Sequence, residues 1–163
     1  MTKGRQMSKI SEGDMAPNFT LPTNGDGSFT LSEKRGSPVV LFFYPKDDTS
    51  GCTKEAIGFS EHLDAFKKLG CVVAGMSADP VKKHDKFIAK HELTTTLISD
   101  EEKTALDAYG VWIEKSMYGK KYMGINRTTV IIDTDGKIAK AWVKVKVPGH
   151  VEEVLATAQE LFG

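Results

Sequence analysis

The sequence predicts an α/β fold with helices on both faces of a central mixed β-sheet. Apolar runs of strand length alternate with one-faced helical segments, and two pairs of such runs are separated by turn residues. The chain has 163 residues, enough for one buried core without disulfide support. Residues 10–163 are therefore predicted to form a single domain, and residues 1–9 a disordered extension.

The first half of the chain begins with an N-terminal hairpin. Residues 16–22 and 28–31 alternate apolar with polar side chains around the turn at 24–27. The apolar run 38–44 ends at a proline and is typical of a buried strand. Residues 53–69 carry apolar side chains every three or four positions before Gly70, which predicts one helix ending there.

The second half continues the alternation and ends with another hairpin and a helix. A turn signature at 133–136 separates the two runs of that hairpin. Asp100 is expected to cap the short helix that follows it. The predicted elements are strand 71–76, helix 79–91, strand 95–99, short helix 103–109, hairpin strands 128–132 and 138–143, and helix 150–162.

Composition and charge exclude several classes of function. Lys plus Arg and Asp plus Glu both number 22, and the basic residues are scattered, which argues against nucleic-acid binding. No apolar run approaches the length of a membrane span, and the N-terminus lacks the apolar core of a secretory signal. Two cysteines without an export signal are typical of a reducing compartment, so a cytoplasmic location is expected.

Cys52 stands at the position where chemistry is expected. It follows the strand at 38–44 and opens a helix, so it should lie at the carboxyl end of a strand and in the first helical turn. Free N–H groups and the helix dipole there favour a thiolate and lower the pKa of a thiol. Most free cysteines are instead buried small hydrophobic residues. The polar residues on both sides of Cys52 argue against that alternative here.

Motifs along nearly the whole chain beyond residue 9 resemble the peroxiredoxins, and most closely the bacterioferritin comigratory protein, or peroxiredoxin Q, subfamily. The central motif is Pro45-x-x-x-Thr49-x-x-Cys52 followed by Thr53-x-Glu55. The supporting motifs are Gly13-Asp14-x-Ala16-Pro17-x-Phe19-x-Leu21, Phe43-Tyr44-Pro45-Lys46-Asp47, Tyr109-Gly110-Val111-Trp112, Gly119-Lys120-x-Tyr122-x-Gly124-Ile125-x-Arg127-Thr128-Thr129 and Asp133-x-Asp135-Gly136-Lys137-Ile138.

The resemblance implies a thioredoxin-like fold and a thiol peroxidase that needs no metal or organic cofactor. Cys52 would be the nucleophile that reduces hydrogen peroxide or an alkyl hydroperoxide and becomes a sulfenic acid. Thr49 would be its hydroxyl partner, Arg127 the distant cation, and Pro45 a shield for the sulfenate. Gly51 would contribute a backbone N–H, and Glu55 would orient Arg127.

Each of these partners also has a plain structural interpretation. Thr49 could be a helix cap, Pro45 a strand terminator, Glu55 a first-turn acid and Arg127 a solvated residue. The four histidines, His62, His84, His91 and His150, lie in polar helical stretches, where solvated side chains and no metal cluster are expected. Trp112 and Tyr118 are expected to be packing residues.

The chain departs from its family at the resolving cysteine. Many members place a second cysteine five residues after the first, where this chain has Ile57. The other thiol, Cys71, lies beyond the predicted helix, whose length of about 25 Å exceeds the reach of a disulfide, about 7 Å between Cα atoms. Cys71 is therefore predicted to be a buried structural residue, and an external thiol would reduce Cys52. Thioredoxin is the first expectation from the resemblance, with glutathione and glutaredoxin as an alternative and an intersubunit disulfide as a further variant.

Three other functions remain open at this point. A redox sensor or holdase would keep a reactive Cys52 with little turnover. A cysteine hydrolase or acyltransferase would need a basic partner, and no histidine is near Cys52 in the sequence. An inert thioredoxin-like binding domain is the third, against which the set of Thr49, Cys52 and Arg127 argues. The resemblance favours a monomer or weak dimer.

Overall fold

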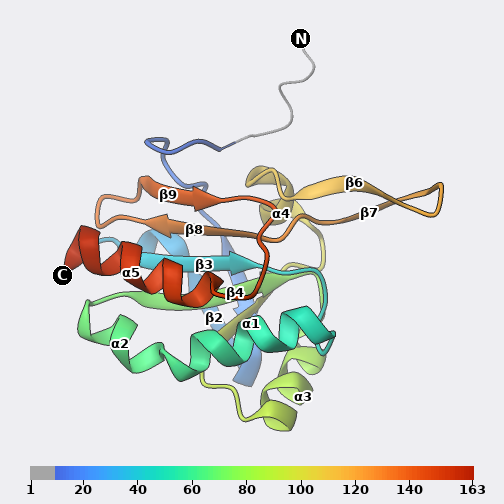
Figure 1. Ribbon diagram of the computed structural model, residues 1–163, viewed down its shortest axis with the longest axis horizontal. Coiled ribbons are helices and arrows are strands. Elements are labelled where there is room, and N and C mark those ends of the chain that lie inside the picture. Colours follow the sequence, from blue (N-terminus) through green and yellow to red (C-terminus); the bar gives the residue numbers. More distant parts are fainter. Residues whose placement is uncertain (1–9) are drawn as a thin grey trace.

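The computed structural model describes residues 10–163; the predicted extension at 1–9 lies outside the described residues. Seven strands form one mixed sheet in the order β2-β1-β5-β4-β3-β8-β9 (Figure 1). The strands are β1 Thr20–Thr23, β2 Gly27–Thr30, β3 Val39–Phe43, β4 Val72–Ser77, β5 Thr96–Ser99, β8 Thr128–Ile132 and β9 Ile138–Trp142. The helices are α1 Ser50–Glu61, α2 Leu63–Lys68, α3 Val81–His91, α4 Thr104–Ala108 and α5 His150–Phe162, with 3-10 turns at Asn24–Asp26 and Leu31–Lys34.

Three parallel strands form the middle of the sheet, and antiparallel strands extend it on both sides. β3 pairs with β4 and β4 with β5 in parallel, whereas β8 pairs antiparallel with β3 and β9 with β8. On the other side the N-terminal hairpin β1–β2 adds to β5 in antiparallel fashion. The predicted mixed sheet and N-terminal hairpin are thus confirmed.

The central strand β3 is buried on both faces, as its unbroken apolar run predicts. Its alternate residues enter two separate hydrophobic clusters. Val40 and Phe42 pack with side chains of α1, α2, α3 and α5. Leu41 and Phe43 face the opposite cluster, which contains side chains of α4 and the N-terminal segment. Helices therefore hold β3, and the segment that follows it, from both sides.

The predicted helix at 53–69 is two helices in the structure. α1 begins at Ser50 and ends at Glu61, and His62 departs from helical geometry with φ −99° and ψ 6° before α2 starts. The imidazole Nδ1 of His62 lies 2.9 Å from the Gly58 carbonyl and so competes for a helix acceptor. The short α2 follows immediately.

Residues 112–125 form a β-hairpin that the sequence analysis did not predict. Strands β6 Trp112–Met117 and β7 Lys120–Ile125 make a separate antiparallel sheet that projects from the body of the molecule (Figure 1). The turn between them consists of Tyr118 (φ 52°) and Gly119 (φ 79°). Two successive positive φ angles are typical of the type I′ hairpin turn. We call residues 112–125 the arm.

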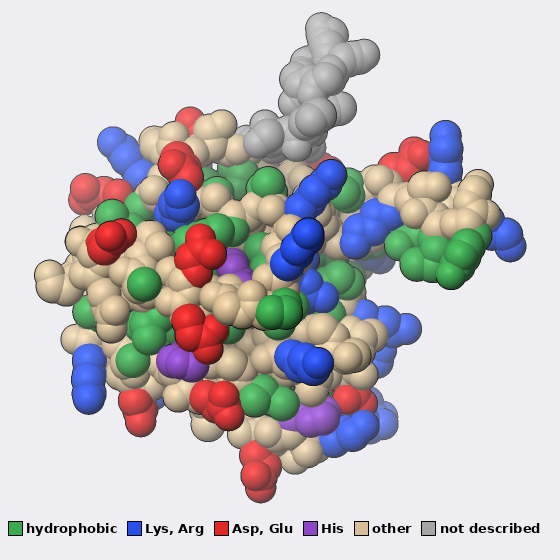
Figure 2. Space-filling view, viewed as in Figure 1, with side chains coloured by type: hydrophobic (Ala, Val, Ile, Leu, Met, Phe, Trp, Pro, Cys, Tyr) green, Lys and Arg blue, Asp and Glu red, His purple; other side chains and the backbone are tan. Residues whose placement is uncertain are grey.

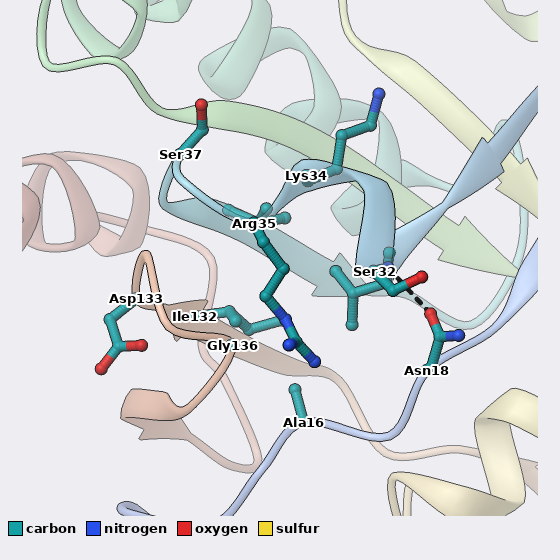
Figure 3. A pocket seen from close by; sticks show the side chains of 11 residues that line it. Ala16, Asn18, Ser32, Lys34, Arg35, Ser37, Ile132, Asp133 and Gly136 are labelled. Atoms are coloured by element: carbon teal, nitrogen blue, oxygen red, sulfur yellow. Dashed lines mark hydrogen bonds between the residues drawn. The ribbon is translucent and has the colours of Figure 1, made fainter.

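A hollow at the amino end of β3 lies far from Cys52 along the strand (Figure 3). The side chain of Arg35 extends across it toward Gly136, where an added Cβ would lie 2.5 Å from Nε of Arg35. Gly136 also has φ +88°, a conformation that favours glycine. Arg35 therefore packs closely on the β8–β9 turn, and the hollow is a structural contact.

Candidate active site

Cys52 lies beyond the carboxyl end of β3, in the first turn of α1. β8 runs antiparallel to β3, and its first residue, Thr128, pairs with Phe43 at the end of β3. The residue before β8, Arg127, is consequently at the same edge of the sheet as Cys52. The pairing of β3 with β8 thus brings together two residues that are 75 positions apart.

The start of α1 offers backbone donors at this edge. The N–H of Thr53 donates to the Thr49 carbonyl at 2.8 Å and forms the first helical hydrogen bond. The N–H groups of Gly51 and Cys52 precede it and have no acceptor within the helix. They add to the positive end of the helix dipole beside the sulfur. The predicted position of Cys52 in a first helical turn is confirmed.

The guanidinium of Arg127 connects Cys52 to Glu55. Its Nη2 donates to the Cys52 Sγ at 3.3 Å, and its Nη1 donates to Oε1 of Glu55 at 2.6 Å. Glu55 lies one helical turn after Cys52, so both side chains emerge on the same face of α1. A planar guanidinium can serve two acceptors at once in this way.

Burial and charge shift the pKa values of this pair. Burial raises the pKa of Glu55 to about 7, against the opposing effect of Arg127. Glu55 is fully buried, and its second carboxyl oxygen, Oε2, has no hydrogen-bond partner among residues 10–163. Burial acts to lower the pKa of Arg127, but Glu55 and Cys52 outweigh it and raise the pKa above its usual value. Arg127 therefore stays charged.

Cys52 is buried, which its polar neighbours in the sequence do not suggest. Only 1% of its surface is exposed, and it packs in the same hydrophobic cluster as Ala56 and Phe59. These residues share one face of α1, while Lys54 points to solvent. Of the polar flanks, Ser50 and Lys54 are exposed whereas Glu55 is fully buried, so the polarity of the neighbouring residues did not indicate whether Cys52 is buried.

The other residues named in the sequence analysis lie around this turn. Thr49 is the N-cap residue of α1, but its hydroxyl donates to the Lys46 carbonyl at 3.0 Å and makes no cap hydrogen bond. Pro45 is half-buried and follows β3 and Tyr44 directly. At Gly51, an added Cβ would lie 3.3 Å from Nη2 of Arg127, so a larger residue would crowd the guanidinium.

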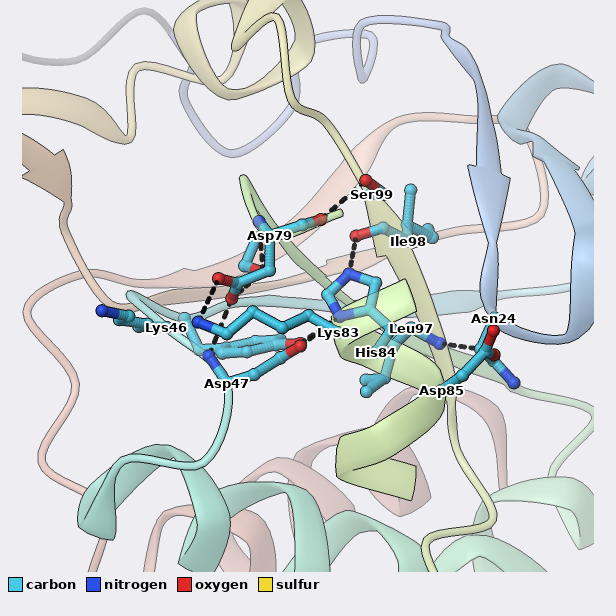
Figure 4. Close-up of polar contacts among 12 residues, drawn as sticks. Asn24, Lys46, Asp47, Asp79, Lys83, His84, Asp85, Leu97, Ile98 and Ser99 are labelled. Carbon is cyan, nitrogen blue, oxygen red and sulfur yellow. Dashed lines mark hydrogen bonds and ion pairs between the residues drawn. The ribbon is translucent and has the colours of Figure 1, made fainter. Parts of the chain in front are cut away.

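A buried polar network anchors the loop that connects β3 to α1 (Figure 4). The Nδ1 of His84 lies 2.6 Å from Oδ2 of Asp47, and its Nε2 lies 2.9 Å from the Ile98 carbonyl. Tyr44 donates its hydroxyl to Oδ1 of Asp47 at 2.6 Å. The carboxylate of Asp79 accepts the Asp47 N–H at 2.7 Å. The loop before Cys52 is therefore tied to α3, to β5 and to the segment between β4 and α3.

Two of the four histidine predictions are wrong. His84 is fully buried in the network above, and His150 is 4% exposed with its Nε2 2.8 Å from the Thr129 hydroxyl. Burial lowers the pKa of His150 to about 4. His91 is partly exposed and lies 2.8 Å from Asp48. The missed signal was helical spacing, because His84 and Phe87 are three residues apart on α3, and His150 shares a face of α5 with Val151 and Val154.

The second cysteine, Cys71, lies at the opposite end of the central strands from Cys52. Cys71 precedes β4, whose first residue pairs with Val39 and whose Met76 pairs with Phe43. Four strand residues, about 13 Å, separate these two registers. Because the chain breaks at His62, the length of one continuous helix no longer measures how far Cys71 lies from Cys52. The pairing of β3 with β4 gives that separation instead. Cys71 is 4% exposed, as predicted, and burial raises its pKa to about 11.

Within residues 10–163, no group of three or more His, Cys, Asp or Glu side chains is arranged to hold a metal ion. In the same range, no helix combines the length and the apolar character that crossing a membrane requires.

Comparison with known proteins identifies the family. Residues 12–141 match the AhpC/TSA family. Peroxiredoxin Bcp of Bacillus subtilis is 42% identical over 152 residues, 93% of this chain and 97% of that protein. Peroxiredoxin Bcp of Escherichia coli is 40% identical over 154 residues, 94% of this chain and 99% of that protein.

Solved structures show the same fold. A cysteine-to-serine mutant of Xylella fastidiosa PrxQ superimposes with a TM-score of 0.88 at 39% identity, covering 93% of this chain and 96% of that one. A structure of the Xanthomonas campestris bacterioferritin comigratory protein superimposes with a TM-score of 0.85 at 39% identity, covering 89% of this chain and 92% of that one. It comes from a study of the alkyl peroxide reduction activity of that protein by trapped intermediate and ligand complex structures. The predicted thioredoxin-like fold is confirmed. The chain belongs to the AhpC/TSA family and, within it, to the Bcp or peroxiredoxin Q peroxidases.

Proposed function

We propose that Cys52 is the peroxidatic residue and that it reduces hydrogen peroxide and alkyl hydroperoxides. The observation that carries this proposal is the Arg127 guanidinium, which donates to the Cys52 sulfur and to the buried Glu55 carboxylate. A cation fixed in this way favours the anionic thiolate and attracts negative charge that develops beside it.

The proposed reaction is an in-line displacement. The Cys52 thiolate attacks the distal peroxide oxygen, so that an S–O bond forms and the O–O bond breaks. The other oxygen leaves with the bonding electrons, takes up a proton and departs as water or alcohol, and Cys52 becomes a sulfenic acid. The N–H groups of Gly51 and Cys52 and the guanidinium of Arg127 are the proposed donors to the departing oxygen, and Pro45 is the proposed shield. The Thr49 hydroxyl, which donates to the Lys46 carbonyl in the structure, is proposed to join them by rotating toward the peroxide. Removal of one such donor typically slows a reaction about 10²–10³-fold.

We propose a one-cysteine cycle in which an external thiol reduces the sulfenic acid. Ile57 occupies the position five residues after Cys52, and Cys71 lies at the other edge of the sheet. Thioredoxin is the proposed reductant, the protein is proposed to act as a monomer or weak dimer, and the proposed location is the cytoplasm, where such reductants keep thiols reduced.

The test is peroxide-dependent NADPH oxidation with thioredoxin and thioredoxin reductase. Wild type and Cys71→Ser should turn over, and Cys52→Ser should not. Intact-mass analysis after one equivalent of peroxide should show one added oxygen on Cys52 and no intrachain disulfide. An untouched Cys52 would overturn the proposed role of this residue. A sulfenic acid without turnover by any thiol would favour the sensor or holdase function instead.

A further inference from the structure

The arm exposes a concentration of apolar side chains. Seven large hydrophobic residues within 10–163 are exposed, and four of them lie on the arm. They are Met117, Tyr118, Tyr122 and Met123, with exposed fractions of 56%, 97%, 44% and 49%. Figure 2 shows apolar side chains gathered on one side of this projection. Tyr118 was expected to be a packing residue and is instead almost fully exposed. Apolar surface grouped in this way is typical of interaction sites.

The arm lies beside the active site. Lys115 of β6 pairs with Tyr122 of β7, about midway along the arm, and its side chain reaches over Gly124, where an added Cβ would be 3.3 Å from Cδ of Lys115. Burial lowers the pKa of Lys115, Arg127 acts in the same direction, and Cys52 opposes it. Lys115 is thus within electrostatic reach of both residues. The arm continues through Ile125 and Asn126 directly to Arg127.

Exposed lysines lie in the segments that carry or contact the Cys52 site, although the whole chain has no net charge. Together with Lys115 we call them the lysine rim: Lys46, Lys54, Lys144 and Lys146. The last two belong to the segment in which the Val145 N–H donates to the Arg127 carbonyl at 2.9 Å. Figure 2 shows basic side chains between the arm and the body.

The acidic residues near Cys52 do not balance this rim, because each already has a basic partner. Glu55 pairs with Arg127 and Asp47 with His84, both in buried positions. Asp48 pairs with Lys90 and His91 of α3. The arm itself has Lys115, Lys120 and Lys121 against one acid, Glu114. A partner that approaches Cys52 therefore meets uncompensated positive charge next to apolar surface.

We propose that the arm and the lysine rim form the docking surface for a protein dithiol whose reactive cysteine is surrounded by apolar side chains and an acidic margin. This inference rests on the proposed function of Cys52. A compact domain of about 100 residues has a radius of gyration of about 13 Å. When its thiol is at Cys52, such a domain also covers the outer half of the arm, because Lys115 and Tyr118 are only about 10 Å apart along the strand. A small thiol does not extend that far.

The docked partner supplies both electrons. Its first thiolate attacks the sulfur of the Cys52 sulfenic acid, so that an S–S bond forms and the oxygen leaves as water after protonation. The second thiol of the partner then attacks the partner's own sulfur in that mixed disulfide. Cys52 leaves as a thiolate, and the partner departs as an intramolecular disulfide.

The experiment compares an arm variant with a matched control variant in three assays. The arm variant is Met117→Ser with Tyr118→Ser, and the control is Met15→Ser with Leu161→Ser, which replaces exposed apolar residues away from the arm. The assays are single-turnover oxidation by hydrogen peroxide without reductant, turnover with dithiothreitol, and turnover with thioredoxin and its reductase.

For the arm variant, the KM for thioredoxin should rise about tenfold, as loss of an interface anchor would cause. Oxidation of Cys52 and turnover with dithiothreitol should match wild type, since neither needs a protein partner. For wild type, the KM for thioredoxin should also rise with salt, because the contact is partly electrostatic. Lys120→Glu should raise the same KM.

Several outcomes would overturn the docking proposal. An unchanged KM in the arm variant, turnover with glutathione but not thioredoxin, or slower oxidation by peroxide in the arm variant alone would each do so. Light scattering that shows a wild-type dimer and an arm-variant monomer would make the arm a self-association surface. Failure of wild-type Cys52 to become oxidised would instead overturn the proposed function, so the two failures are distinguishable.

Discussion

Asp47 and His84 form a fully buried pair that joins the loop before Cys52 to α3. The Nδ1 of His84 lies 2.6 Å from Oδ2 of Asp47, and neither side chain is more than 1% exposed. The Nε2 of His84 must carry a proton, because the Ile98 carbonyl at 2.9 Å can only accept. The pair therefore fixes the loop that contains Pro45 and Thr49 against the helix opposite it.

Replacement of His84 by Ala should destabilise the protein strongly. The carboxylate of Asp47 would stay buried without its partner, and loss of one member of a buried pair typically costs about 3–5 kcal/mol. The matched control is His91→Ala, which removes a partly exposed partner of Asp48 and should cost less than about 1 kcal/mol. Urea unfolding gives both free energies of unfolding. Equal losses in the two variants would contradict a dominant role for the buried pair.

His84 also shows where sequence reasoning failed. Its neighbours Lys82, Lys83, Asp85 and Lys86 suggested a solvated stretch, yet its partner Asp47 is 37 positions away and only the tertiary fold brings the two together. The arm was missed for a different reason. Most of its side chains are exposed on both faces, so its strands lack the alternation of a half-buried strand.

The main sheet was predictable because its strands bury long apolar runs. The predicted range of the β8 strand, 128–132, and that of the α5 helix, 150–162, match the structure. The position of Cys52 in a helical turn after a buried strand followed from local signals alone. Its contact with Arg127 did not, because this contact depends on the pairing of β3 with β8. The motif resemblance named Arg127, but the residues by themselves gave no distance.

The free energy of unfolding should depend on pH through Glu55, and Glu55→Gln should remove this dependence. Its pKa is about 7 in the folded chain and about 4.5 when unfolded, so the folded state binds the proton more tightly. Its stabilising contribution is complete below about pH 4.5 and is lost as the pH rises through 7. Between about pH 4.5 and pH 7, the free energy of unfolding of wild type should therefore fall by on the order of 3 kcal/mol relative to that of Glu55→Gln. Urea unfolding at pH 4.5, 6 and 8 measures the difference between the two proteins.

Comparison of wild type with Glu55→Gln at each pH cancels the contributions that other titratable groups make to the pH dependence of stability. His150 acts in the opposite direction, because its lowered pKa makes stability fall as the pH drops from about 6.5 to 4. Since both proteins contain His150, its effect should be the same in each. A gap between the two proteins that stays constant from pH 4.5 to 8 would show that the pKa of Glu55 is not raised.

Gly75 should not tolerate even alanine. It lies in β4 opposite Phe42 of β3, and an added Cβ would be 2.6 Å from Cζ of Phe42 and 3.1 Å from Cδ2 of Leu97. Phe42 in turn stacks on Phe59 of α1 with 4.4 Å between ring centroids, so it has little room to move. Gly75→Ala should lower the free energy of unfolding by about 1–3 kcal/mol. If the added methyl group clashes with Phe42, Phe42→Leu should lower the free energy of unfolding less in the Gly75→Ala variant than in wild type. If the losses from the two substitutions are additive, Phe42 is not the residue that the methyl group meets.

Replacement of Arg127 by Lys should slow the oxidation of Cys52 by peroxide. Lysine keeps the charge but offers a single ammonium group, which cannot donate at the same time to Cys52 and to Glu55 in the planar arrangement of the guanidinium. Loss of one positioned donor predicts a decrease of about 10²–10³-fold in the second-order rate constant. Stopped-flow measurement of a single oxidation, without any reductant, reports this step alone.

Arg35→Lys is the matched control, because Arg35 lies in the hollow at the amino end of β3, away from Cys52. It should oxidise at the wild-type rate, and urea unfolding of both variants separates a loss of reactivity from a loss of folding. A wild-type rate for Arg127→Lys would mean that positive charge alone, without the two-pronged contact, is sufficient at this site.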